Sequence, residues 1–317
     1  MIYFIIPGLY EHYNLNFRLL MLLQQRPEYF RDDFKIYACY GNFQHCIFEG
    51  GRMFPNYKQT CQEEVEAVTK IYNDFGISIR LIFTSNQLQP EHYYNRFNNV
   101  VLETCQNDMN EVVISDNNFM HWVKEKYPAY QFISSTTKCI VDLDTAEQEL
   151  LCSEFKTICL DYNLNKEFEF LNSLPENIKQ KTELLANAVC PSHCPHRKNH
   201  YKLNSLYNLS FAQSLPDMPK CGITCQTTHP KARNYPNTIL PDEMYNVYDP
   251  MGIRLMKLEG RTFNTTEQAL IYSYYMAKDE YKDIVTQVLA RHLPSQPCEN
   301  SIEQYEKDKQ VILQLNI

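Results

Sequence analysis

The chain has 317 residues, of which 44% are hydrophobic, and a formal net charge of −8. This length fits one large domain or two average ones, and the hydrophobic fraction excludes a disordered chain. The acidic balance argues against nucleic acid or a membrane surface as the partner. The N-terminus has no basic start and its apolar run ends at Pro7, which excludes a signal peptide and a membrane span. We therefore expect a cytoplasmic protein whose twelve cysteines are thiols or metal ligands rather than disulfides.

Short apolar runs alternate with amphipathic stretches from one end of the chain to the other. In chain order, the first half predicts a strand at 2–6, a helix at 14–30, a strand at 35–41, a helix at 61–76, a strand at 78–86, a helix at 93–107, a strand at 111–117 and a helix at 118–128. The second half predicts a strand at 130–137, a helix at 144–155, a strand at 157–163, helical residues at 165–181, strands at 182–189 and 253–260, and a long helix at 265–293. Gly76 is expected to end its helix, Asp144 to cap one, and Pro175 to interrupt one.

This order of strands and helices predicts a parallel sheet, because each strand is followed by a helix that can cross over to the next. Eight such units in a chain of this size favour a (β/α)8 barrel, a single domain over residues 1–317, above an open doubly wound sheet. Residues 190–252 interrupt the pattern with a long Cys-rich insertion between the seventh and eighth strands. Long connections at the C-terminal face of a barrel are usually functional.

The predicted strands end in polar residues, and in a barrel these ends meet at one rim, where barrel enzymes work. Seven of them are candidate substrate-binding residues: Asn42, Asn86, Asn117, Ser135, Lys138, Asn163 and Asn187. Five charged residues are candidate catalytic groups: Asp116, Asp161, Lys257, Glu259 and Arg261. Asn, Asp and Ser also favour turns, which accounts for individual positions better than for the whole set.

A polar mouth of this kind suits a small polar substrate, and Lys257 or Arg261 could pair with a carboxylate on it. Asp161 and Glu259 are candidate general acids or bases; the structural alternative is that each balances Lys257 or Arg261. Lys138 could form a Schiff base, although it follows the strand rather than lying within it. The sequence contains no Ser-His-Asp, nucleophile-elbow, GxGxxG or P-loop pattern.

The insertion carries two cysteine pairs of C-x3-C spacing, Cys190 with Cys194 and Cys221 with Cys225. Four thiolates suit a [4Fe–4S] cluster or a tetrahedral zinc ion, and unligated thiols are the third interpretation. A nearby histidine, such as His193, could replace one of the cysteines. An iron–sulfur site at the mouth would have a redox or substrate-anchoring role, whereas a zinc site would stabilise the insertion.

The segment KLEGR, residues 257–261, followed by a predicted helix, resembles the signature of the collagenase-like peptidase family. Residues 37–52 are loosely similar to that family's early glycine-bearing strand and the arginine after it. The resemblance implies a barrel and, for several family members, a four-cysteine [4Fe–4S] cluster. It also implies either oxygen-independent hydroxylation of RNA or of a quinone ring, or peptidase activity.

This chain departs from the family pattern in two respects. Its four cysteines form two C-x3-C pairs, whereas the family has a pair six apart followed by two separate cysteines. We also expect it to work without the downstream domain that family members associate with RNA. We expect an iron–sulfur enzyme that carries out redox or hydroxylation chemistry on a small polar molecule or a modified macromolecule. The alternatives are a peptidase-like hydrolase and a non-catalytic cluster- or zinc-binding subunit that works with a protein partner.

Overall fold

The computed structural model describes residues 1–53, 59–210 and 235–291. Eight parallel strands close into a barrel in sequence order, so that β1 pairs with both β2 and β8. The strands are β1 (Ile2–Pro7), β2 (Phe34–Gly41), β3 (Ser78–Phe83), β4 (Glu111–Ile114), β5 (Gln131–Ser134), β6 (Thr157–Cys159), β7 (Thr182–Leu185) and β8 (Leu255–Lys257). The predicted (β/α)8 barrel is confirmed, and a closed ring of strands excludes the open sheet.

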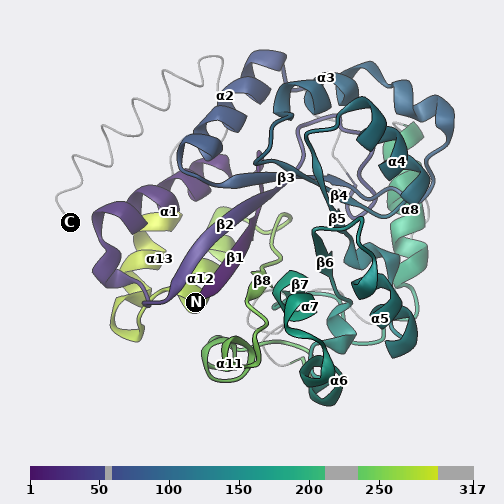
Figure 1. Ribbon diagram of the computed structural model, residues 1–317. Coiled ribbons are helices and arrows are strands. Elements are labelled where there is room, and N and C mark those ends of the chain that lie inside the picture. The colour runs from purple at the N-terminus through teal and green to yellow at the C-terminus, as the bar shows by residue number, and fades with distance from the viewer. Residues whose placement is uncertain (54–58, 211–234, 292–317) are drawn as a thin grey trace.

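Helices surround the ring of strands, as parallel neighbours joined by crossovers require (Figure 1). The helices of the strand–helix units are α1 (Tyr13–Gln25), α2 (Gln62–Asp74), α3 (Arg96–Cys105), α4 (Asn117–Lys126), α5 (Leu143–Leu151), α6 (Phe168–Ser173), α7 (Glu176–Lys181), α12 (Thr265–Met276) and α13 (Lys282–Ala290). The described part of the connection from β7 to β8 adds α8 (Arg197–Ser210), α10 (Pro241–Glu243) and α11 (Asp249–Met251). Within the described ranges, no helix is long and apolar enough to span a membrane.

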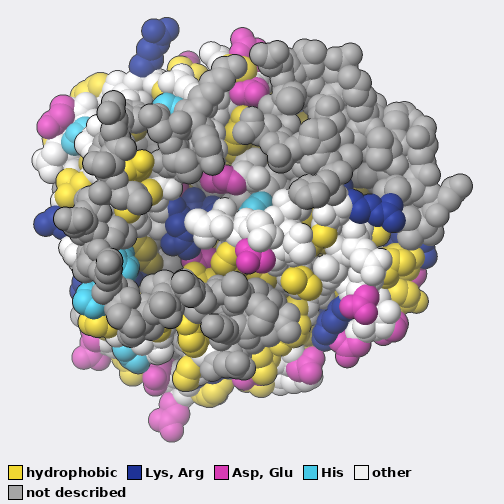
Figure 2. Space-filling view, turned by 180° about the vertical axis from the view of Figure 1, so that it is seen from behind, with side chains coloured by type: hydrophobic (Ala, Val, Ile, Leu, Met, Phe, Trp, Pro, Cys, Tyr) yellow, Lys and Arg dark blue, Asp and Glu magenta, His cyan; other side chains and the backbone are white. Residues whose placement is uncertain are grey.

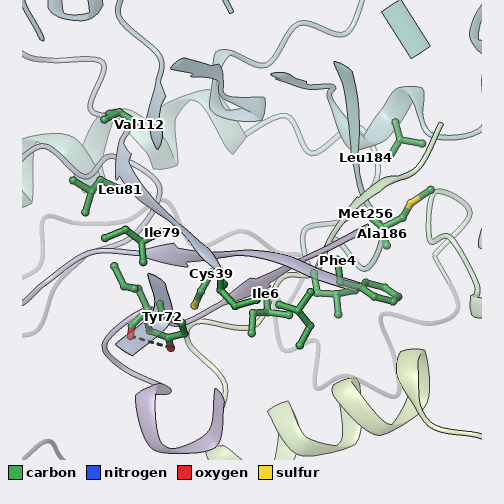
Figure 3. Close-up of a cluster of buried hydrophobic side chains, with 14 of the residues drawn as sticks. Phe4, Ile6, Cys39, Tyr72, Ile79, Leu81, Val112, Leu184, Ala186 and Met256 are labelled. Carbon is green, nitrogen blue, oxygen red and sulfur yellow. Dashed lines mark hydrogen bonds between the residues drawn. The ribbon is translucent and has the colours of Figure 1, made fainter. Parts of the chain in front are cut away.

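The core has two layers because strand side chains alternate between the two faces of the sheet. The outward-facing side chains pack against the helices in a large buried cluster, part of which Figure 3 shows, including Phe4, Ile6, Cys39, Ile79, Leu81, Val112, Leu184 and Met256. A second cluster fills the barrel interior and consists of Ile5, Ala38, Tyr40, Ile82, Val113 and Ile133. The interior is therefore packed, so a ligand would have to bind beyond the strand ends.

An ion-pair cluster crosses the interior near the start of the strands. The guanidinium of Arg80, which is fully buried, lies with Nε 2.5 Å from Glu111 Oε2 and also donates to Glu183 across the barrel. Glu111 accepts further bonds from Lys156 Nζ at 2.7 Å and from the Tyr37 hydroxyl at 3.0 Å. Burial disfavours ionisation of Glu111, but the charges of Arg80 and Lys156 outweigh it and hold the pKa of Glu111 below its ordinary value. This cluster ties β3, β4 and β7 together through the centre of the barrel.

The boundaries of several predicted elements were wrong. The third predicted strand reaches 86, whereas β3 ends at Phe83, and the polar residues that follow it form a loop. The helix predicted at 144–155 is capped by Asp142, whose side chain accepts from Thr145 N at 2.8 Å, and not by Asp144. Gly76 has a φ of 72° directly after α2, as a helix-ending glycine should, and Pro175 separates α6 from α7.

The long helix predicted at 265–293 is two helices, α12 and α13. The chain leaves the helical conformation at Ala277, which forms an isolated antiparallel bridge with Phe30. Backbone hydrogen bonds on either side join Arg31 N to Met276 O at 2.8 Å and Lys278 N to Tyr29 O at 3.0 Å. Pairing with the segment after α1 therefore overrides local helix propensity.

Candidate active site at the mouth of the barrel

Polar side chains continue the interior face of the barrel beyond the strand ends. Each lies two positions after an inward-facing residue, and together they are Asn42, Thr84, Ser115, Ser135, Asp161, Asn187 and Glu259. We call these residues, with the charged groups that bind them, the mouth. Figure 2 shows a hollow near the middle of one face of the molecule, with Lys and Arg side chains at its floor next to Asp and Glu side chains.

One part of the mouth is a bidentate pair between Arg261 and Glu49. The two guanidinium nitrogens donate to the two carboxylate oxygens at 2.9 Å each, and Glu49 is fully buried. Asn42 Nδ2 also donates to Glu49 Oε2, at 2.7 Å, while the Asn42 amide bonds both backbone groups of Ile82. The charge of Arg261 is thus already balanced by a buried protein carboxylate, and the pair fixes the loop after β2 against the loop after β8.

A second part centres on Glu259. Its Oε1 accepts from Arg52, and its Oε2 accepts from the backbone N–H of Val189 at 3.0 Å. Asn187 extends the β7–β8 pairing, because its amide exchanges two hydrogen bonds with the Glu259 backbone, at 2.7 and 3.0 Å. The Glu259 side chain keeps 14% of its surface exposed. It is therefore an oriented carboxylate with lone pairs left for a ligand.

Gly260 follows in the same loop because a side chain cannot fit there. Its φ is 156°, and a Cβ at this position would collide with the amide of Gln268 on α12. The Gly260 carbonyl accepts from the His12 ring at 3.0 Å, and burial lowers the pKa of His12. Close packing on both sides thus fixes the direction in which Glu259 and Arg261 leave the strand.

The third part joins Asp161 to Arg197 of α8. Arg197 Nη1 lies 2.6 Å from Asp161 Oδ2, and Arg197 Nη2 donates to the carbonyl of Thr136 at 2.9 Å. The guanidinium stacks on the ring of Tyr162, with 4.1 Å from Cζ to the centroid. Asn163 donates to the other Asp161 oxygen at 2.8 Å from its side chain. Asp161 therefore pairs with Arg197, and Glu259 pairs with Arg52. The prediction that these carboxylates balance Lys257 or Arg261 was wrong.

Lys257 lies deeper, one interior layer below Glu259. Its Nζ is 4.2 Å from the centroid of the Tyr40 ring and 3.9 Å from Glu183 Oε1, and the residue is only 7% exposed. The Tyr40 hydroxyl donates to the Leu258 carbonyl at 2.8 Å, which holds the ring in place. Lys257 therefore links the mouth to the ion-pair cluster around Arg80.

Helix α8 crosses the mouth from the ends of β5 and β6 to the loops after β2 and β3. At its N-terminal end Arg197 binds residues 136 and 161, as described above. At its C-terminal end Asn208 Nδ2 donates to the carbonyls of Glu49 and Arg52 at 2.8 and 2.7 Å, and Asn204 Nδ2 donates to Gly51 O at 3.2 Å. The helix is thus a roof over the site, attached by hydrogen bonds at both ends.

Several predicted site residues lie away from this group. Asp116 caps α4, since its Oδ1 accepts from Phe119 N at 3.0 Å. Lys138 Nζ lies 2.6 Å from Glu149 Oε1 on α5 and 3.3 Å from Asn117 Oδ1, which draws it toward the helix layer. Asn86 is exposed and also lies away from the mouth, whereas Ser135 belongs to the mouth and its hydroxyl also caps the turn that follows it.

Cys190 and Cys194 are half-buried free thiols just after β7. Cys190 follows Val189, whose N–H binds Glu259, and packs beside Tyr162 and Leu185. Cys221 and Cys225 lie outside the described residues. No set of three or more His, Cys, Asp or Glu side chains suited to a metal ion occurs in the described ranges.

The sequence reasoning missed four residues that shape the mouth: Glu49, Arg52, Arg197 and Tyr201. Arg52 and Glu49 lie in the segment quoted for the family resemblance, but no local pattern marked them as partners of Glu259 and Arg261, which are 207 and 212 positions away. Arg197 and Tyr201 could have been found from the four-residue spacing of α8, had a helix been expected in the insertion.

The fold and site together define a (β/α)8-barrel protein with a charged C-terminal mouth under a helical roof. No family model matches the chain. One stretch of 80 residues is 31% identical to a protein of Methanocaldococcus jannaschii named uncharacterized protease MJ1657, over 25% of this chain and 23% of that protein, so the match spans less than a quarter of the relative's length. Among solved structures, the U32 peptidase Mk0906 is 15% identical, with a TM-score of 0.46 over 82% of this chain and 93% of that one. The name of this partial relative, a protease, agrees with the resemblance to the collagenase-like peptidases.

Proposed function

We propose that the chain is an enzyme related to the collagenase-like peptidases that binds a small polar substrate at the mouth of the barrel. The observation that carries this proposal is the convergence of oppositely charged groups from the ends of β2, β6 and β8 under α8. Glu259 is the proposed proton-transferring residue, because its carboxylate is oriented by two donors and still reaches the open side of the mouth.

The proposed cofactor is a [4Fe–4S] cluster bound by Cys190, Cys194, Cys221 and Cys225. Cys190 and Cys194 are free and half-buried, and Cys190 follows Val189, whose N–H binds Glu259, which is compatible with half of such a donor set near Glu259. A cluster there would supply electrons for oxygen-independent redox or hydroxylation chemistry. Zinc is the alternative occupant of the same four thiolates.

Peptide-bond hydrolysis is the second candidate, favoured by the name of the protease that part of the chain matches. For that reaction Glu259 would activate a water molecule, and the guanidinium of Arg52 beside it would stabilise the oxyanion. An assay with labelled casein separates the two candidates. Hydrolysis that is lost in Glu259→Gln, with an unchanged melting temperature, supports the peptidase.

The cofactor is tested by anaerobic purification followed by quantification of iron, acid-labile sulfide and zinc. The proposal predicts about four iron and four sulfide per chain, both lost in Cys190→Ser and Cys194→Ser. Cys152→Ser is the matched control, since Cys152 is also half-buried but lies after α5. Zinc in place of iron, or metal that survives both substitutions, contradicts the cluster.

A further inference from the structure

Helix α8 turns a polar face toward the barrel, which is the reverse of an ordinary surface helix. The inward side chains recur at helical spacing and are Arg197, Tyr201, Asn204, Ser205 and Asn208. On the opposite side Leu206 is 42% exposed. Because the face of α8 over the mouth is polar, its side chains can bind a ligand as well as hold the helix on the barrel.

Tyr201 differs from the other residues of this face in having an unused donor. Its oxygen accepts from Arg197 Nε at 3.1 Å. Within the described ranges, its own O–H has no acceptor, although the side chain is half-buried. Asn204, Ser205 and Asn208, in contrast, are engaged by the loops after β2 and β3.

Two positive charges lie near that hydroxyl: Arg197, which donates to it at 3.1 Å, and Arg52, whose backbone carbonyl accepts from Asn208 on the same face of α8 at 2.7 Å. Burial raises the pKa of Tyr201, while the charges of Arg197 and Arg52 act to lower it. Arg197 is nearly buried and its N–H groups are engaged by Asp161, Thr136 and Tyr201 itself. Arg52 is more open, with 28% of its side chain exposed, and two of its five N–H groups bind Gly51 and Glu259.

We propose that Tyr201 and Arg52 form the carboxylate-binding subsite of the mouth. Tyr201 donates its O–H to one oxygen of the ligand's carboxylate, and the free N–H groups of Arg52 bind the other. Arg197 acts behind Tyr201 as a positioning residue, since it fixes the phenol and contributes charge. Arg52 also holds Glu259, so the bound carboxylate is anchored next to the proposed proton-transferring group. This inference rests on the proposed function, whose substrate it narrows to a carboxylate-bearing molecule.

The test is isothermal titration of the anaerobically purified full chain with succinate, and with succinamide as the uncharged analogue. Tyr201→Phe removes only the donor, and we expect it to weaken succinate binding about tenfold or more, the usual effect of losing a hydrogen bond to a charged group. Tyr207→Phe is the matched control, because Tyr207 lies on the same helix outside the inward-facing set. It should bind succinate like the wild type.

Equal succinate affinity in Tyr201→Phe and wild type would overturn the subsite, as would wild-type binding of succinamide as tight as that of succinate. Tighter binding of inorganic phosphate than of succinate would overturn the assignment to a carboxylate. Iron and sulfide are measured on the same samples. Absence of iron and sulfide therefore counts against the proposed cofactor alone. Equal affinity for succinate and succinamide counts against the subsite alone.

Discussion

Replacing Arg80 with Met should destabilise the protein by about 3–5 kcal/mol at pH 7, the usual result of removing one partner from a buried ion pair. Arg80 is fully buried between two carboxylates. Without it, Glu111 keeps Lys156 at 2.7 Å, whereas the remaining cation that the described residues place near Glu183 is Lys257, at 3.9 Å. Most of the loss therefore comes from an uncompensated carboxylate in the barrel interior.

The sign of the pH dependence follows from Glu111. Its pKa lies below the ordinary value of 4.5 in the folded protein, so its contribution to stability is present above that pH and is lost as the pH falls below it. In Arg80→Met the folded-state pKa of Glu111 rises, because burial then acts on it without the charge of Arg80. The difference in unfolding free energy between variant and wild type should be largest at pH 7 and shrink toward pH 4.5.

Urea unfolding followed by the fluorescence of Trp122 measures this difference, because Trp122 is the single tryptophan and stacks on Phe119 in the core, with centroids 5.7 Å apart. Arg254→Met is the control; its ion pair with Asp249 is 44% exposed on the arginine side and is worth about 0–1 kcal/mol. A loss under 1 kcal/mol in Arg80→Met, or a difference that grows in acid, would refute this reasoning.

Three further outcomes are expected. Arg261→Lys should cost about 1.5–3 kcal/mol in urea unfolding, since one ammonium cannot replace two hydrogen bonds to buried Glu49; wild-type stability would contradict this. Gly50→Ala should weaken the contact of α8 with the loops after β2 and β3, because the new Cβ would collide with the Thr84 carbonyl and lie 2.6 Å from Ser205 Oγ, and limited proteolysis should then cut within residues 197–210; an unchanged digest would count against it. Iodoacetamide should modify exposed Cys61 before any buried thiol, as peptide mass spectrometry can measure. A buried thiol modified first would contradict the packing described above.

The barrel could be predicted from the sequence because its signal is repeated eight times, in apolar runs separated by amphipathic stretches. The strand ends could be predicted as polar, but not which side chains meet. Glu49 and Arg261 are 212 positions apart, and their pairing depends on the closure of the barrel. The polar inward face of α8 could not be predicted either, because sequence patterns are normally interpreted with the apolar side of a helix facing the core.

Two other predicted site residues differ in the structure because a neighbouring helix uses their side chains. Lys138 is drawn to Glu149 by an ion pair that only the packing of α5 on β5 creates. Asp116 is at a strand end, as expected, but the first turn of α4 uses its carboxylate as a cap. A polar residue at a strand end thus has structural uses as well as functional ones, and the sequence alone does not separate them.

Hydrogen–deuterium exchange of the full chain with and without succinate tests the central claim most directly. If the charged mouth under α8 is the working site, protection should rise in residues 49–52, 187–190, 197–208 and 257–261, where the contacts of Glu259, Tyr201 and their partners lie. Protection confined to the opposite end of the barrel, or no change in these four segments, would contradict the account.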